Sequence, residues 1–293
     1  MGETDSDWRL ETFTASDGYR WRYRHYGSAW VAASQPGATL VCLHGIQSHA
    51  GWYDHSITVL SQAGYDVYFL DRRGSGVNEA ARGDTPGYRR LVDDIAEFLH
   101  EVRSRQVDSP IPVCVVAISW GGKLAAALQL THPGLIDGLA LLCPGFCPRV
   151  RPPLGERIRI ALARLVSPTR RFEIPLNDPQ LFTDTPKWQD FIRHDPLALR
   201  HATARLLVES IRLDRLIRRV HRQIDIPILL MLAGRDRIID NVRTRRLVEQ
   251  FRSPDLEVLE YPDAGHTLEF ETNPEPFIGD LRNWLGRHCR VMR

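Results

Sequence analysis

The chain has 293 residues, a length that fits two domains or one large domain carrying an insertion. Its composition, with 43% hydrophobic and 25% charged residues, is typical of a soluble globular protein and excludes a disordered chain, a collagen and a coiled coil. The 38 basic and 36 acidic side chains leave a net charge of only +2, which argues against nucleic acid as a partner.

The cysteines and the first residues bear on the compartment. The chain has five cysteines, an odd number, and Cys42, Cys114 and Cys143 lie in apolar runs where a reduced cysteine behaves as a small hydrophobic residue. The opening residues are acidic and polar, unlike a signal peptide, and no apolar run has the roughly 18 residues that a membrane span needs. We therefore expect reduced cysteines, no transmembrane segment and a cytoplasmic address.

Short apolar runs alternate with helical patterns in the first half of the chain. Residues 10–26 hold two aromatic-rich strand candidates around a Ser16-Asp17-Gly18 turn, which predicts an antiparallel edge. The alternation that follows is typical of βαβ units and predicts a mostly parallel sheet covered by helices on both faces. The predicted strands cover 39–43, 66–71, 111–118 and 138–143, and the predicted helices cover 88–105 and 124–130.

The alternation breaks between residues 144 and 226, where no strand run occurs. Two amphipathic helices are expected there, around 156–166 and 197–220, so this segment is predicted to be a helical cap inserted into a core made of 1–143 and 227–293. Strands at 227–232 and 256–261 and helices at 242–251 and 274–288 complete a sheet of about eight strands. The apolar faces of the cap helices carry residues such as Ile160, Leu162, Leu165, Leu206 and Leu207, and those that face the site are expected to line an acyl pocket.

The strand at 111–118 runs into Ser119-Trp120-Gly121-Gly122 and then a helix, the context in which a nucleophilic serine is held on a sharp turn. Small residues two positions before and after the serine are needed because the turn presses the strand end against the helix start. Ala117 and Gly121 meet that need, although glycine is usual at the first position. Ser119 alone could equally be a helix-capping serine.

The order of the other groups favours a catalytic serine. Asp236 follows the strand at 227–232, and His266 follows the strand at 256–261, so the three residues come in the order nucleophile, acid, histidine. The carboxyl ends of parallel strands meet at one edge of the sheet, which predicts that the three side chains lie together. Asp240 and Asp263 are competing acids that lie less well at a strand-to-loop transition.

Acyl transfer also needs hydrogen-bond donors for the oxyanion, and the backbone N–H groups of Ile46 and Trp120 are the candidates. His44 beside them is expected to pack its loop rather than act as a base. The spacing of Cys143 and Cys147, without a second pair, does not predict a zinc site, so no metal and no cofactor are expected. The segment from Arg72 to Gly76 lacks the end of a nucleotide-binding loop and is interpreted as a tight turn.

Taken together, His44-Gly45, the Asp71-Arg-Arg-Gly-Ser-Gly76 loop, Ser119 in its turn, Asp236 in Gly-Arg-Asp-Arg-Ile-Ile and Gly265-His266 resemble the α/β-hydrolase fold. The similarity is greatest to its monoacylglycerol lipase and lysophospholipase branch and spans residues 15–288. The cap segment from Phe191 to Leu197 resembles that branch as well. The resemblance implies hydrolysis of carboxylic esters of single-chain lipids, a small-molecule partner, and transient contact with a membrane surface through the cap.

Two other functions remain open. A serine aminopeptidase of the proline iminopeptidase kind is favoured by Ser119-Trp120-Gly121-Gly122, whereas the loop from His44 to Gln47 lacks the glycine-rich oxyanion sequence usual there. A non-catalytic ligand-binding protein on the same scaffold is the second alternative, because a fold does not fix a function. Dehalogenases and epoxide hydrolases would need a carboxylate at position 119.

Overall fold

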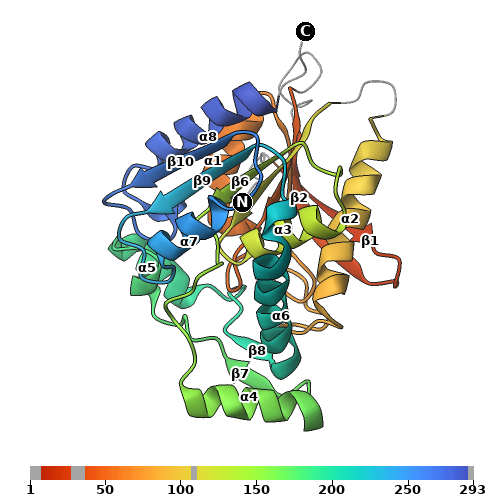
Figure 1. The fold of residues 1–293 in the computed structure, drawn as a ribbon, viewed down its shortest axis with the longest axis vertical. Coiled ribbons are helices and arrows are strands. Elements are labelled where there is room, and N and C mark those ends of the chain that lie inside the picture. The colour runs from red at the N-terminus through yellow and green to blue at the C-terminus, as the bar shows by residue number, and fades with distance from the viewer. Residues whose placement is uncertain (1–7, 28–36, 107–110, 290–293) are drawn as a thin grey trace, which may run out of the picture.

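A computed structural model describes residues 8–27, 37–106 and 111–289, and its centre is an eight-stranded sheet (Figure 1). The strand order is β1-β2-β4-β3-β5-β6-β9-β10, with β1 and β2 antiparallel at one edge and the other six strands parallel. The predicted sheet is confirmed. The strands are β1 (Arg9–Thr14), β2 (Arg20–Tyr26), β3 (Thr39–Leu43), β4 (Asp66–Leu70), β5 (Val113–Ile118), β6 (Gly138–Leu142), β9 (Ile228–Ala233) and β10 (Leu256–Tyr261).

Helices cover both faces of this sheet, and the alternation of side chains along each strand explains why. In β3, Val41 and Leu43 pack in one hydrophobic cluster, and Leu40 and Cys42 pack in another on the opposite face. The first cluster includes the buried stripes of α2, α3 and α7, and the second includes those of α1 and α8. The helices are α1 (Asp54–Gln62), α2 (Tyr88–Ser104), α3 (Gly121–Thr131), α7 (Asn241–Val248) and α8 (Glu275–His288).

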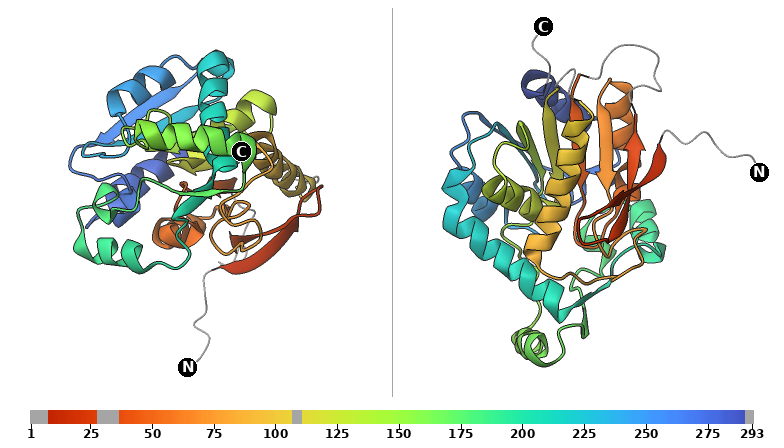
Figure 2. Two further views of the ribbon diagram at one scale, coloured as in Figure 1. Left: turned by 90° about the horizontal axis from the view of Figure 1, so that it is seen from below. Right: turned by 90° about the vertical axis from the view of Figure 1, so that its right-hand side faces the viewer.

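The segment between β6 and β9 lies beyond one end of the sheet, at the bottom of Figure 1 and of the right-hand view in Figure 2. Its helix α6 packs against α3 of the core and against α4. The segment contains α4 (Leu154–Val166), β7 (Arg171–Glu173), α5 (Pro186–His194), β8 (His201–Thr203) and α6 (Ala204–Val220). Short 3-10 turns lie at Ala50–Tyr53, Pro179–Leu181, His221–Gln223 and Leu268–Phe270.

Two expectations about this segment are wrong. β7 and β8 form a small antiparallel sheet where no strand was expected, and α5 lies between them. The helix expected over 197–220 begins only at Ala204, because Thr203 is extended and its Oγ1 accepts a hydrogen bond from the backbone N–H of Leu206 at 3.1 Å. Strands of three residues are too short to leave a periodic apolar pattern in the sequence.

The expectation that the cysteines are reduced is also wrong for one pair. Cys114 in β5 and Cys289 after α8 form a disulfide across 175 residues of sequence, whereas Cys42, Cys143 and Cys147 are free and buried. The pairing arises because α8 packs over the sheet and brings its last turn to the buried strand β5. The odd number of cysteines therefore gives no support to a reducing compartment.

Among the described helices, none combines the length and the apolar character needed to cross a lipid bilayer.

Candidate active site

Ser119 lies in the turn between β5 and α3 and has a backbone φ of 51°, in the left-handed region that non-glycine residues rarely adopt. Backbone bonds fix this conformation: the N–H of Ser119 donates to the carbonyl of Leu142, and its carbonyl accepts from the N–H of Gly145. A Cβ at Gly121 would lie 2.5 Å from the carbonyl oxygen of Leu43. Glycine is required at 121 because the start of α3 touches the end of the neighbouring strand β3. The sequence predicted a small residue at this position but not the contact with β3.

His266 and Asp236 complete a chain of hydrogen bonds from Ser119. The Nε2 atom of His266 is 2.9 Å from the Oγ of Ser119, and its Nδ1 is 2.7 Å from the Oδ2 of Asp236. The other carboxylate oxygen of Asp236 accepts from the backbone N–H groups of Ile238 and Ile239, each at 2.8 Å. These bonds leave the carboxylate one orientation, in which it holds the proton of the imidazole on Nδ1 and directs Nε2 toward the hydroxyl.

The competing acids have other partners. Asp240 is the N-cap of α7 and accepts from the backbone N–H of Arg243 at 3.0 Å. Asp263 is exposed and pairs with Arg235 on the surface. Of the three aspartates weighed from the sequence, the structure therefore brings only Asp236 to the histidine.

The loop that carries His266 is held by residues of the segment between β6 and β9. The carbonyl of Phe182 accepts from the backbone N–H of Thr267 at 2.9 Å, and the Phe182 ring lies edge-on to the imidazole. On the other side of the histidine, the N–H of Gly265 donates to the Glu271 carboxylate at 2.7 Å. The position of the imidazole thus depends on contacts with Glu271 and with the segment between β6 and β9.

The predicted oxyanion donors lie beside Ser119. Ile46, Trp120 and Ser119 line the same cavity, and among the described residues the backbone N–H groups of Ile46 and Trp120 donate to no protein acceptor. Two free N–H groups next to a nucleophilic oxygen are what a developing oxyanion requires.

Arg72 contacts both donor segments, and the sequence did not single it out. Its guanidinium donates to the carbonyl of Gly45 at 2.7 Å and to the carbonyl of Ile46, and it lies over the Trp120 ring at 4.9 Å from the ring centre. The side chain is buried and has no ion pair with a carboxylate in the described residues. Burial lowers the pKa of Arg72, but arginine is so basic that the group stays charged at neutral pH. The tight turn predicted for 72–76 therefore also supplies the side chain that contacts both segments carrying the oxyanion donors.

His44 packs its loop, as predicted. Burial and the nearby Arg72 guanidinium hold the pKa of His44 well below its usual range, so the ring is neutral. The neutral ring can accept a hydrogen bond from the backbone N–H of Arg72 at Nε2 and donate from Nδ1 to the carbonyl of Gly45. Both ring nitrogens are then occupied away from Ser119.

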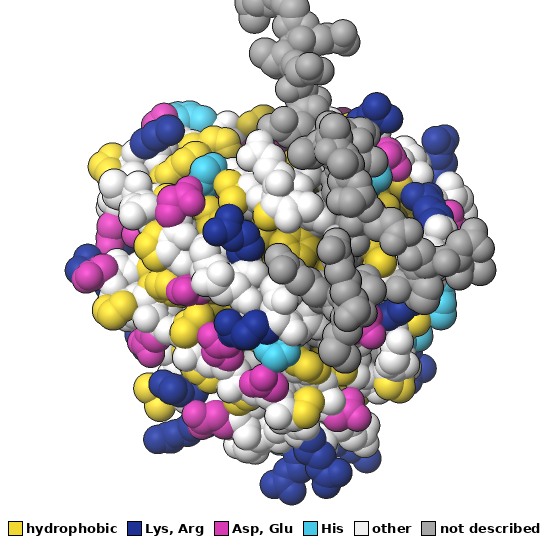
Figure 3. All heavy atoms as spheres, turned by 90° about the horizontal axis from the view of Figure 1, so that it is seen from above, with side chains coloured by type: hydrophobic (Ala, Val, Ile, Leu, Met, Phe, Trp, Pro, Cys, Tyr) yellow, Lys and Arg dark blue, Asp and Glu magenta, His cyan; other side chains and the backbone are white. Residues whose placement is uncertain are grey.

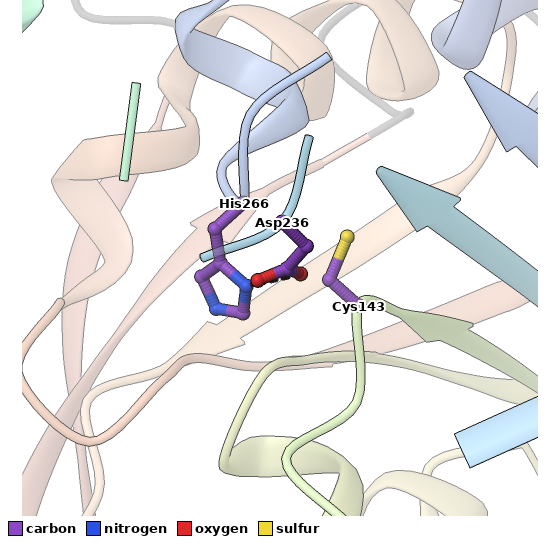
Figure 4. A group of neighbouring side chains, drawn as sticks. All are labelled: Cys143, Asp236 and His266. Atoms are coloured by element: carbon purple, nitrogen blue, oxygen red, sulfur yellow. Dashed lines mark hydrogen bonds and ion pairs between the residues drawn. The ribbon is translucent and has the colours of Figure 1, made fainter. Parts of the chain in front are cut away.

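A buried thiol adjoins the carboxylate. Figure 4 shows the Asp236 carboxylate between the His266 ring and the Cys143 side chain, and ligand atoms of the three residues lie within 4.8 Å of one another. This donor set does not suit a metal ion, because both ring nitrogens of His266 are engaged by Ser119 and Asp236. Burial and the Asp236 charge raise the pKa of Cys143, which keeps the sulfur protonated and a poor metal ligand.

The cavity at Ser119 has a volume of about 400 Å³ and runs out between α4 and α6. Of the five apolar cap residues considered for its lining, Ile160 and Leu207 face the cavity. Leu206 is instead buried in the core, and Leu162 and Leu165 are 59% and 79% exposed. The other apolar lining comes from Pro148, Val150, Pro152, Ala161, Ile174, Pro175, Leu176, Val208, Ile211, Ile238 and Ile239, besides Ile46 and Trp120.

Known proteins share this architecture. A monoacylglycerol lipase of Mycolicibacterium smegmatis is 26% identical over 272 residues, covering 88% of this chain and 91% of that protein. A monoglyceride lipase of Mus musculus is 25% identical over 267 residues, covering 87% and 84%. The solved structure of a soluble variant of monoglyceride lipase from Saccharomyces cerevisiae matches with a TM-score of 0.84 at 21% identity, covering 97% of this chain and 96% of that one. Residues 34–273 match the family described as "Serine aminopeptidase, S33", so the chain belongs to this family of α/β hydrolases.

Proposed function

We propose that the protein is a serine hydrolase that cleaves carboxylic esters of single-chain lipids through an acyl-enzyme on Ser119. The observation that carries this proposal is the hydrogen-bonded chain from Ser119 through His266 to Asp236, which opens into a largely apolar cavity. The relatives named as monoacylglycerol and monoglyceride lipases support the same substrate class.

In the proposed reaction, the Oγ of Ser119 attacks the ester carbonyl carbon while Nε2 of His266 takes the hydroxyl proton. The carbonyl oxygen becomes an oxyanion that accepts hydrogen bonds from the N–H groups of Ile46 and Trp120. When the intermediate collapses, the C–O bond to the alcohol breaks and the alcohol leaves with the proton from His266. A water molecule, deprotonated by His266, then attacks the acyl-enzyme and releases the carboxylic acid and free Ser119.

Arg72 is proposed as a positioning residue for this step. Because its guanidinium binds the carbonyls of Gly45 and Ile46 and lies over the Trp120 ring, it fixes both oxyanion donors relative to each other. Donors that are held in place before the reaction stabilise the oxyanion without the cost of reorienting them.

The aminopeptidase alternative is disfavoured by the charges around Ser119. An aminopeptidase must bind the α-ammonium group of its substrate, for which a carboxylate is the natural partner. Asp214 is the one carboxylate among the described residues that line the cavity, and it is ion-paired with Lys123 at 2.7 Å. A non-catalytic binding protein would not need the hydrogen-bonded chain to be intact.

A direct comparison of substrates tests the proposed function. A series of p-nitrophenyl esters from acetate to palmitate is assayed beside aminoacyl p-nitroanilides, with the Ser119→Ala variant as the blank. We expect Ser119-dependent hydrolysis of the esters and little of the anilides. Faster hydrolysis of the anilides would assign the protein to the aminopeptidases instead.

We further propose that residues 144–226 act as a cap distinct from a core of 1–143 and 227–293, and that α4 touches lipid surfaces. The helix exposes a row of large apolar side chains: Leu154, Ile158, Leu162, Leu165 and Val166. Such a patch on an otherwise polar surface is typical of a membrane or protein contact. In a flotation assay, the wild type should rise with phosphatidylcholine vesicles, and the Leu162→Ser/Leu165→Ser variant should stay at the bottom of the gradient. Equal flotation of both proteins would refute this contact.

The cytoplasmic address stays a prediction, and the Cys114–Cys289 disulfide weakens its basis. Fractionation of cells that express the chain at its native level would test it. Recovery with the soluble cytoplasmic fraction is the expected result, and recovery outside the cell would overturn it.

A further inference from the structure

The cavity at Ser119 carries more positive charge than the chain as a whole. Its lining includes five basic side chains, Lys123, Arg151, Arg157, Arg215 and Arg218, and a single carboxylate, Asp214, which gives the lining a net charge of +4. The whole chain carries only +2, so this excess is local. A cavity that received only a neutral acyl chain would gain nothing from these charges.

The charges nearest the nucleophile cancel each other. Lys123, in the helix that follows Ser119, is buried and pairs with Asp214 of α6 at 2.7 Å. Beside this pair, the indole N–H of Trp120 donates to the hydroxyl of Ser210 at 2.8 Å. These polar groups have partners within the protein, so the excess positive charge belongs to the four arginines.

Those four arginines come from two elements that flank the opening. Arg157 lies on α4 and Arg151 on the segment before it, whereas Arg215 and Arg218 lie on the second half of α6. All four are exposed. In the part of the chain that the structure describes, none of them forms an ion pair, and Arg151 donates only to the carbonyl of Pro148.

Some exposed arginines elsewhere on the molecule have carboxylate partners, and others, such as Arg246 and Arg252, form no ion pair with a described residue. Arg235 pairs with Asp263, Arg237 with Asp184, and Arg245 with Glu249. On the face opposite the cap, basic side chains (dark blue) and acidic side chains (magenta) are interspersed (Figure 3). What sets the four arginines apart is that they line one cavity, whose single carboxylate, Asp214, is already paired with Lys123.

We infer that the ester cleaved at Ser119 carries an anionic group, a carboxylate or a phosphate, at a distance from the ester bond, and that Arg151, Arg157, Arg215 and Arg218 recognise it. The inference rests on the proposed function and specifies its substrate class. Guanidinium groups bind carboxylates and phosphates through paired N–H donors, and several of them around one opening suit a group with two or three acceptor oxygens. The apolar walls near Ile160 and Leu207 then hold the alkyl part that joins the anion to the ester.

Two matched pairs of water-soluble esters test this inference and locate the anion. The first pair is p-nitrophenyl hexanoate and mono-p-nitrophenyl adipate, which differ in a terminal carboxylate on the acyl side. The second pair is 1-hexanoylglycerol and its 3-phosphate, which differ on the alcohol side. All are used as monomers in solution, without vesicles or detergent.

For at least one pair, we expect the wild type to show a kcat/KM for the anionic ester about 5- to 30-fold above that for the neutral ester, a preference that shrinks at about 1 M salt. The Arg215→Gln/Arg218→Gln variant should lose about tenfold on the anionic ester, mainly through a higher KM, and change less than about twofold on the neutral ester. The matched control is Arg246→Gln/Arg252→Gln, two exposed arginines outside the cavity lining, which should behave as wild type.

Equal hydrolysis of both esters in each pair would overturn the inference while leaving the proposed function intact. The same holds if the double variant loses activity equally on neutral and anionic esters. In a separate assay with the ester presented in anionic vesicles, a loss of activity in the double variant that the soluble esters do not show would assign the arginines to membrane binding and would also overturn the inference. If no ester in either pair is hydrolysed in a Ser119-dependent way, the proposed function fails together with the inference.

Discussion

Replacing Arg72 by methionine separates the positioning of the oxyanion donors from the stability of the fold. The substitution keeps much of the apolar stem but removes the guanidinium, which donates to the carbonyls of Gly45 and Ile46 and covers the Trp120 ring. Methionine cannot replace these bonds, so the two segments that carry the donor N–H groups lose their common support.

The expected changes in stability and in kcat follow from the contacts that Arg72 makes. The Gly45 carbonyl keeps a possible donor in Nδ1 of His44 at 2.7 Å, whereas the Ile46 carbonyl loses its side-chain donor, which costs about 1–3 kcal/mol of stability. Removing a buried charge without a carboxylate partner offsets part of that cost. Complete loss of one oxyanion donor lowers kcat by about 100- to 1000-fold, so displaced donors should lower it by about 10- to 100-fold with little change in KM.

The assay measures kcat and KM on a p-nitrophenyl ester, the affinity for a trifluoromethyl ketone that forms an oxyanion adduct with Ser119, and the free energy of unfolding. Arg82→Met is the matched control, since Arg82 also donates to backbone carbonyls, those of Gly76 and Leu197 at 2.8 Å and that of Ala198 at 3.5 Å, but to neither segment that carries an oxyanion donor. Arg72→Met should weaken the ketone in proportion to kcat, and Arg82→Met should not. Equal loss of kcat in both variants, or an unchanged ketone affinity in Arg72→Met, would refute the reasoning.

Three further outcomes are expected. Asp236→Asn should lower kcat about 10⁴-fold by favouring the wrong histidine tautomer, and Asp240→Asn should not; the opposite result in the ester assay would move the acid. Replacing 144–226 by a short Gly/Ser linker should abolish the rise of kcat/KM with acyl length, worth about 0.8 kcal/mol per buried CH₂, while some acetate hydrolysis remains; an unchanged chain-length profile would remove the cap from the acyl site. Cys289→Ser should lower the free energy of unfolding by about 2–5 kcal/mol in urea titrations without lowering kcat; equal stability of the two proteins would contradict the disulfide with Cys114.

The parts of the fold that can be predicted from the sequence are those that leave a local pattern of apolar and polar residues along the chain. The buried strands β3, β5 and β9 are apolar runs bounded by polar turns, and they were placed to within about two residues. Ser119, Asp236 and His266 are predictable as a group because each follows a predicted strand and the parallel sheet brings these loops to one edge. Their catalytic role remains a prediction until it is assayed.

The features that the sequence did not indicate depend on contacts between distant segments. Arg72 resembles any polar turn residue until β3 and β4 pair and place its side chain against the loop after β3. The Cys114–Cys289 disulfide spans 175 residues, and no local pattern links its ends. The positions of Leu162 and Leu165 on the outer face of α4 depend on how that helix packs against α6, so helical periodicity alone could not separate lining residues from exposed ones.

The central claim, that Ser119 is a nucleophile activated by His266, is tested most directly by covalent labelling with a fluorophosphonate. The native protein should take up one phosphonyl group, and peptide mass spectrometry should place it on Ser119. The Ser119→Ala and His266→Ala variants, once circular dichroism has shown that they are folded, should be labelled far more slowly than the native protein. A folded wild type that resists labelling, or one that is labelled at another serine while Ser119→Ala keeps its esterase activity, would contradict the claim.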